Sequence, residues 1–192
     1  KDVSGILHGP EVIPVRGWIL DSDDGDFGGL SALSVDRRGF LALSDTGLIA
    51  MLPPGLGSAT LRSMPPVCVP HQLKRERDSE SLARAPDSGT IWVGFEYRNM
   101  ICRITAAGKP HAFAPPALPG GPKLGGPEAM LRRQDGSFLV FAERARTGGS
   151  RAPLLHFDRD PADPEARVTA MAYDAPAEYH PVDAAMLPDG RM

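Results

Sequence analysis

The sequence predicts an all-β protein of repeated four-stranded blades, a β-propeller. Two observations predict this class. A hairpin pattern recurs at a step of roughly fifty residues, which is typical of propeller blades. The 192 residues also include 21 glycines and 20 prolines without a collagen-like period, which indicates many turns rather than long helices.

Four segments carry the repeated hairpin: a short strand, a glycine-containing turn and, in the first three, a second strand rich in β-branched and aromatic residues. The segments are residues 29–45, 80–96, 128–143 and 183–190. The equivalent apolar position recurs at steps of 49, 48 and 56 residues, at Leu33, Leu82, Met130 and Met186. Asp-Gly-type turns tolerate the positive φ of a tight hairpin, so we predict a hairpin in each segment.

A third strand is predicted in two units, at Met100–Ile104 and at residues 153–157. Residues 51–66 and 108–127 are predicted to be loops between blades; the second has six prolines and five glycines. The best helical candidate, residues 72–85, has a run of charges and no apolar stripe, so no helix is predicted there.

The last unit stops at Met192, where its second strand should begin. Closed propellers need about four to eight blades. We therefore expect residues 1–192 to be one propeller domain, incomplete at the C-terminus. It would cover about three and a half blades of a propeller that has six when complete. The alternative is a β-sandwich, which has no reason to repeat one hairpin at a fixed step.

Composition excludes some partners and leaves one covalent question open. A net charge of −3 gives no electrostatic reason to expect nucleic acid, and no 18-residue apolar window supports a membrane span. Cys68 and Cys102 are the only cysteines, and a disulfide or two buried free thiols are equal alternatives. The chain begins at Lys1 without a signal region, as expected if a signal peptide was removed or the sequence was trimmed.

Acidic residues recur where the hairpin strands open and close. In a propeller the innermost strand of a blade starts at one rim of the channel, and the next strand returns to that rim. Six carboxylates occupy these positions: Asp45, Glu80, Glu96, Glu128, Glu143 and Asp183. We therefore expect them to converge on one rim.

Crowded carboxylates suit two kinds of chemistry. Hard oxygen ligands bind Ca²⁺ or Mg²⁺, and the predicted metal ligands are Asp45, Glu80, Glu128 and Asp183. Carboxylates also serve general acid–base catalysis, and the predicted catalytic residues are Glu80, Glu96, Glu128, Glu143 and His180. The structural alternative is that these carboxylates pair with arginines or accept backbone N–H groups.

Arginines and histidines near these positions complete the predicted site. Arg98 and Arg144 follow Glu96 and Glu143 closely and would grip a phosphate or carboxylate. His71 is predicted to bind ligand, and exposure in a loop is the alternative for His71 and His180. Ser31 is not predicted to be a nucleophile, because its Gly-Leu-Ser context lacks the second glycine of a nucleophile elbow.

Several phrases resemble one known family. Residues 27–33 (Phe-Gly-Gly-Leu-Ser-Ala-Leu) and 40–47 (Phe-Leu-Ala-Leu-Ser-Asp-Thr-Gly) resemble the phytase-like family described as having esterase-like activity. Residues 78–82, 91–96, 127–130 and 141–143 resemble its later blades, so the similarity covers most of residues 26–192. The resemblance implies a propeller fold, a periplasmic or secreted bacterial protein, and hydrolysis of a small-molecule ester or phosphoester.

Two functions therefore stand side by side. The first is a metal-assisted ester or phosphoester hydrolase. The second is a non-catalytic propeller that binds a ligand or partner protein on its acidic rim, since the sequence has no complete nucleophile–base motif. A third reading makes the carboxylates purely structural ion pairs.

Overall fold

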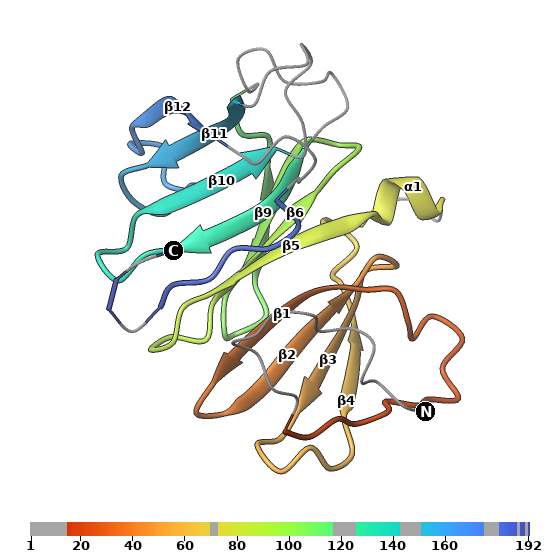
Figure 1. Ribbon diagram of the computed structural model, residues 1–192. Coiled ribbons are helices and arrows are strands. Elements are labelled where there is room, and N and C mark those ends of the chain that lie inside the picture. Colours follow the sequence, from red (N-terminus) through yellow and green to blue (C-terminus); the bar gives the residue numbers. More distant parts are fainter. Residues whose placement is uncertain are drawn as a thin grey trace.

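The computed structural model describes residues 15–69, 73–116, 126–142, 151–174, 181–187, 189–190 and 192, and these form three four-stranded antiparallel sheets (Figure 1). Blade 1 contains β1 (Leu30–Asp36), β2 (Gly39–Ser44), β3 (Leu48–Leu52) and β4 (Thr60–Ser63). Blade 2 contains β5 (Ser79–Arg84), β6 (Ile91–Phe95), β7 (Met100–Ile104) and β8 (Pro110–Phe113). Blade 3 contains β9 (Pro127–Arg132), β10 (Phe138–Ala142), β11 (Arg151–Phe157) and β12 (Val168–Asp174).

Strands follow one another in chain order within each blade, and β5 contacts β1 on one side and β9 on the other. The predicted repeat of four-stranded β-blades is therefore confirmed. The three described blades do not close a ring.

The fourth strands correct the loop prediction. Residues 51–66 contain β4, and residues 108–127 contain β8 and the first residue of β9. Both β4 and β8 have four residues, lie at the sheet edge and bury none of them. Edge strands tolerate proline, as at Pro110, and need no apolar alternation, so they left no pattern in the sequence.

Two smaller features also differ from expectation. Residues 72–85, predicted to hold no helix, include the single helical turn α1 (Lys74–Arg77). In the fourth unit the predicted turn is present, since the Gly190 N–H donates to the Leu187 carbonyl at 3.0 Å. The described residues 181–187 before it form no strand.

The apolar core lies between the blades. Leu41 and Leu43 of blade 1 pack with Leu82 and Val93 of blade 2. A second cluster joins Trp92 to blade 3 residues that include Phe138. Because blade 2 is covered on both faces, every residue of β6 is buried.

Cys68 and Cys102 form a disulfide, with Cα atoms 5.8 Å apart, which decides the alternative that the sequence left open. It ties the segment after β4 in blade 1 to β7 in blade 2, and both residues are fully buried. No helix within the described residues is long and apolar enough to cross a membrane.

Candidate functional site

Each blade carries an irregularity at the same point of its first strand. The pairing of β1 with β2 skips Ser31, that of β5 with β6 skips Glu80, and that of β9 with β10 skips Glu128. Such bulges redirect a side chain and are frequent beside functional sites. They place Glu80 and Glu128 at equivalent rim positions.

Three carboxylates from two segments of blade 2 form a close group. Oxygens of Asp78, Glu80 and Glu96 all lie within 4.8 Å of one another, and the three residues are half-buried. Asp78 precedes β5 and Glu96 follows β6, and the Glu96 N–H donates to the Asp78 carbonyl at 3.2 Å. This backbone bond holds the two ends of the hairpin together. We call Asp78, Glu80 and Glu96 the acidic group.

Neighbouring blades add charge on both sides of the acidic group. On the blade 1 side, Lys74 forms an ion pair with Asp45 at 2.9 Å, and Asp45 acts electrostatically on Asp78. On the blade 3 side, the charge of Glu128 acts on Glu80. The rim therefore joins side chains from three blades.

This crowding changes the protonation of the group. Partial burial, the charges of Asp78 and Glu128, a hydrogen bond to Asp78 and the charge of Glu96 raise the pKa of Glu80 to about 8. Partial burial and the charge of Asp45 also raise the pKa of Asp78, while the bond from Glu80 and the charge of Lys74 oppose this. At neutral pH, Glu80 is therefore protonated and donates a hydrogen bond to Asp78.

A glycine keeps the rim tight. A Cβ on Gly126, which precedes β9, would collide with the carbonyl oxygen of Phe95 and would lie 2.7 Å from the Cα of Glu96. Only a residue without a side chain lets the start of blade 3 approach Glu96 this closely.

The acidic group fits a hard divalent cation. Ca²⁺ takes oxygen ligands at about 2.3–2.6 Å, so two oxygens on one ion lie at most about 5 Å apart. The oxygens of Asp78, Glu80 and Glu96 meet this limit. A cation would also relieve the repulsion that, after partial burial, raises the pKa of Glu80.

The structure places the other predicted residues in three ways. Asp183 lines a hollow with Ser31 of blade 1, outside the acidic group, and accepts the Ala184 N–H at 2.8 Å. Arg98 turns to blade 1 and donates to the Cys68 carbonyl at 3.0 Å. The residues that lie outside the described parts of the chain are His71, Glu143, Arg144 and His180.

Sequence reasoning missed Asp78 and Lys74. Asp78 lies two residues before Glu80, so strand periodicity places both on one side of β5. That spacing was an available signal. Lys74 reaches Asp45 only because α1 lies beside the rim (Figure 1), and no local pattern predicts that contact.

The chain belongs to the phytase-like family, which is described as 'Esterase-like activity of phytase'. The model of this family matches residues 25–192. This confirms the resemblance seen in the sequence. No curated protein matches the sequence.

Solved structures resemble the fold. A streptogramin B lyase structure matches with a TM-score of 0.50 and 17% identity, covering 84% of this chain and 46% of that chain. A catalytically inactive virginiamycin B lyase from Staphylococcus aureus with quinupristin matches with a TM-score of 0.51 and 17% identity, covering 86% of this chain and 48% of that one. The lyase is a β-propeller, and the chain spans about half the length of these structures.

Proposed function

We propose that this chain carries the cation-binding rim of a propeller hydrolase that cleaves phosphate or carboxylic esters. The observation that carries the proposal is the acidic group, because three carboxylate oxygens within 4.8 Å are costly unless protonated or bound to a cation. The phytase-like family supports the reaction class.

Asp78, Glu80 and Glu96 would hold the divalent cation, Ca²⁺ being our first choice. When bound, the ion would polarise a phosphoryl or carbonyl oxygen of the substrate. Glu128 lies next to Glu80 across the boundary between the blades and is our candidate for proton transfer.

We further propose that the complete protein closes a ring of about six blades outside the cytoplasm. The outer faces of the described array support closure, since blade 1 presents a cluster around Leu52 and blade 3 one around Phe141. The Cys68–Cys102 disulfide supports an oxidising compartment.

The test measures cation binding and turnover separately. Calorimetry with Ca²⁺ and with Mg²⁺ is paired with hydrolysis of p-nitrophenyl phosphate and p-nitrophenyl acetate. Glu80→Gln and Glu96→Gln should each weaken cation binding at least tenfold and lower turnover in parallel. Asp87→Asn, an exposed acid on the opposite turn of blade 2, is the charge-matched control.

A second function is favoured if the cation binds and neither ester turns over. The serine hydroxyls of the rim favour this non-catalytic alternative. Ser31 donates to the backbone carbonyl of Ser79, and Ser79 donates to that of Ser44, so both hydroxyls already serve in structural hydrogen bonds. In that case the rim is a binding surface for a ligand or partner protein. No saturable cation binding would refute the metal part of the proposal.

A further inference from the structure

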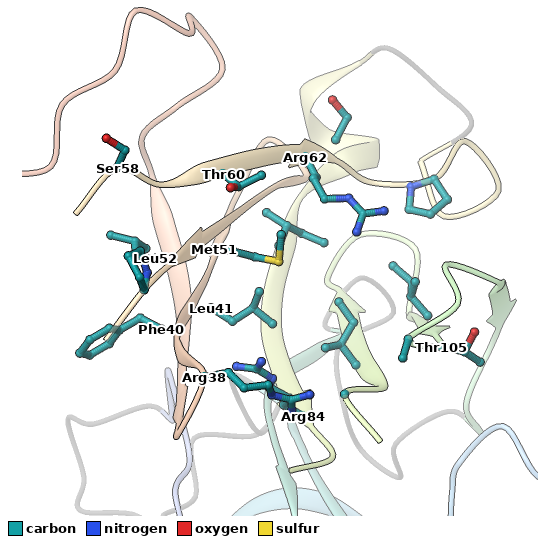
Figure 2. A pocket seen from close by; sticks show the side chains of 18 residues that line it. Arg38, Phe40, Leu41, Met51, Leu52, Ser58, Thr60, Arg62, Arg84 and Thr105 are labelled. Atoms are coloured by element: carbon teal, nitrogen blue, oxygen red, sulfur yellow. The ribbon is translucent and has the colours of Figure 1, made fainter. Parts of the chain in front are cut away.

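A cavity of about 550 Å³ lies between blades 1 and 2, away from the acidic rim (Figure 2). Its volume is in the range of small-molecule pockets, about 300–1,000 Å³. Arg84 at the end of β5 lines the cavity, whereas Glu80 stands at the start of β5. Four residues of strand separate the two by about 13 Å.

The cavity exists because blade 1 has smaller side chains where blade 2 has large ones. Leu41 pairs with Met51 across β2 and β3, and the same register places Trp92 opposite Arg103 in blade 2. Between blades 2 and 3, Asp160 accepts from Trp92 Nε1 at 2.8 Å and from Arg103 Nη1 at 3.0 Å. The equivalent space there is only about 270 Å³.

The loop after β7 lacks the residue that would seal the larger cavity. Asp160 lies in the loop after β11 of blade 3. The loop after β7 of blade 2 instead presents the small Thr105 and Ala106 to the cavity. Neither side chain can bridge two blades as Asp160 does through its bonds to Trp92 and Arg103.

The floor of the cavity is apolar. Side chains of both blades form it: Leu41, Ile49, Met51, Ile91 and Ile104. Met51 points into the space in Figure 2, and 37% of it is exposed to solvent. An apolar group entering the cavity would remove this surface from water, which is favourable.

The walls carry an excess of positive charge. Arg38 and Arg84 share Asp36, at 2.7 and 3.2 Å, so two guanidiniums meet one carboxylate. Desolvation opposes ionisation of Asp36, but hydrogen bonds from Arg38 and the charges of both arginines hold its pKa below the ordinary value. Arg62 lines the opposite wall (Figure 2).

Charge and shape together define the ligand class. Among the described residues that line the cavity there is no aspartate or glutamate. Three arginines against Asp36 leave a surplus of two positive charges beside an apolar floor. Arginine binds carboxylate and phosphate groups through paired N–H donors.

We propose that this cavity is a second ligand site, which binds an amphiphilic anion with an apolar body and a carboxylate or phosphate headgroup. The body lies on the floor formed by Leu41 and Met51, and the headgroup meets Arg62 on its wall, with Arg38 and Arg84 adding positive charge from the opposite wall. The inference does not depend on the proposed hydrolase function, because the acidic rim is at the other end of β5.

The test uses octanoate and octyl phosphate as probes, with octylamine as the cationic counterpart. Calorimetry and methyl NMR of Met51 and the isoleucines measure binding to the complete protein. Both anions should bind saturably, perturb Met51, and bind at least tenfold more tightly than octylamine. Arg62→Gln should weaken anion binding about tenfold, whereas Arg37→Gln, an exposed arginine outside the lining, should leave it unchanged.

Filling the cavity provides the second variant. Leu41→Trp copies the residue that occupies the equivalent position in blade 2 and should abolish binding of both anions. The same substitution at Leu139, the equivalent position in blade 3, is the control. Anion binding that survives Arg62→Gln and Leu41→Trp unchanged, or no saturable binding at millimolar probe, would overturn the proposal.

Discussion

The two boundaries between blades use the same backbone geometry and reach opposite results. Between blades 2 and 3, Trp92 and Arg103 converge on Asp160 and close the space. Between blades 1 and 2, Leu41 and Met51 occupy the equivalent strand positions and leave a cavity of about 550 Å³. Repetition of the fold thus fixes where blades meet, and a few side chains decide whether the boundary is sealed.

The same boundaries differ at the acidic rim. From blade 1, Asp45 faces Asp78, and Lys74 counters this repulsion. From blade 3, Glu128 faces Glu80 and adds to the rise in the pKa of Glu80. The boundary that is well packed in its interior is therefore the electrostatically strained one at its rim.

We expect the largest loss of stability from a substitution at the boundary between blades 2 and 3, where Trp92 fills the space. Trp92→Ala removes a buried indole that packs edge-on against Phe138, with ring centroids 4.8 Å apart. It should cost about 3–5 kcal/mol of unfolding free energy. Leu41→Ala, at the other boundary, should cost about 2–3 kcal/mol, because leucine is smaller than tryptophan and Leu41, although buried, borders an existing cavity. Urea unfolding followed by circular dichroism measures both, and equal costs would contradict the difference between the boundaries.

The disulfide stabilises the boundary between blades 1 and 2, where the cavity lies. The Cys68–Cys102 bond closes a loop with a sequence separation of 34, which should contribute about 3–4 kcal/mol. The Cys68→Ala/Cys102→Ala double variant should lose this stability. Hydrogen exchange should show faster exchange in β2, β3 and β7, with smaller changes in β9 to β11. Uniform loss of protection across all three blades would refute a local role.

Much of this arrangement follows from the sequence, and the reasons for success are physical. The inner strands repeat an apolar pattern around Leu33, Leu82 and Met130, so their step of about fifty residues is visible, although Leu33 in β1 is exposed while Leu82 and Met130 are buried. Strand direction then predicts that Glu80 and Glu96 meet at one rim. The outer strands β4 and β8 bury no residue, so selection for packing leaves no comparable pattern.

Contacts between blades could not be predicted in the same way. Asp160 meets Trp92 across 68 residues of sequence, and Lys74 reaches Asp45 through a turn of helix. Such contacts depend on loop paths that carry no periodic signal. The cavity was invisible for the same reason, because it results from a size difference at Leu41 and Met51.

The rim comparison predicts a pH effect with a definite sign. Below pH 4.5 the Glu80 carboxyl is protonated in both states, so it contributes nothing. Between about 4.5 and 8 the folded state keeps a proton that the unfolded state has lost, so stability falls as the pH rises. Glu80→Gln removes this loss and should stabilise the cation-free protein at pH 8 by on the order of 1 kcal/mol, discounted for solvent screening of a half-buried group.

Two comparisons make the pH prediction specific. At pH 4 the Glu80→Gln variant and the parent should unfold at the same denaturant concentration. Asp45→Asn, which removes the partner of Lys74, should give no such gain at pH 8. If the stability of the parent protein rises between pH 4.5 and 8 without divalent cation, the raised pKa of Glu80 is contradicted.

The smallest expected effect tests the polar part of the seal. Asp160→Asn keeps an oxygen that accepts from Trp92 Nε1 and removes the charge that pairs with Arg103. The substitution should therefore lower the free energy of unfolding by about 1 kcal/mol. Because the Arg103–Asp160 pair is partly exposed, added salt should reduce the cost. Asp36→Asn is the counterpart at the other boundary, where the substitution leaves Arg38 and Arg84 facing each other without a shared carboxylate. Asp36→Asn should therefore lower the free energy of unfolding at least as much as Asp160→Asn. A smaller loss would show that the boundary between blades 1 and 2 does not need the Asp36 carboxylate to hold Arg38 and Arg84 together.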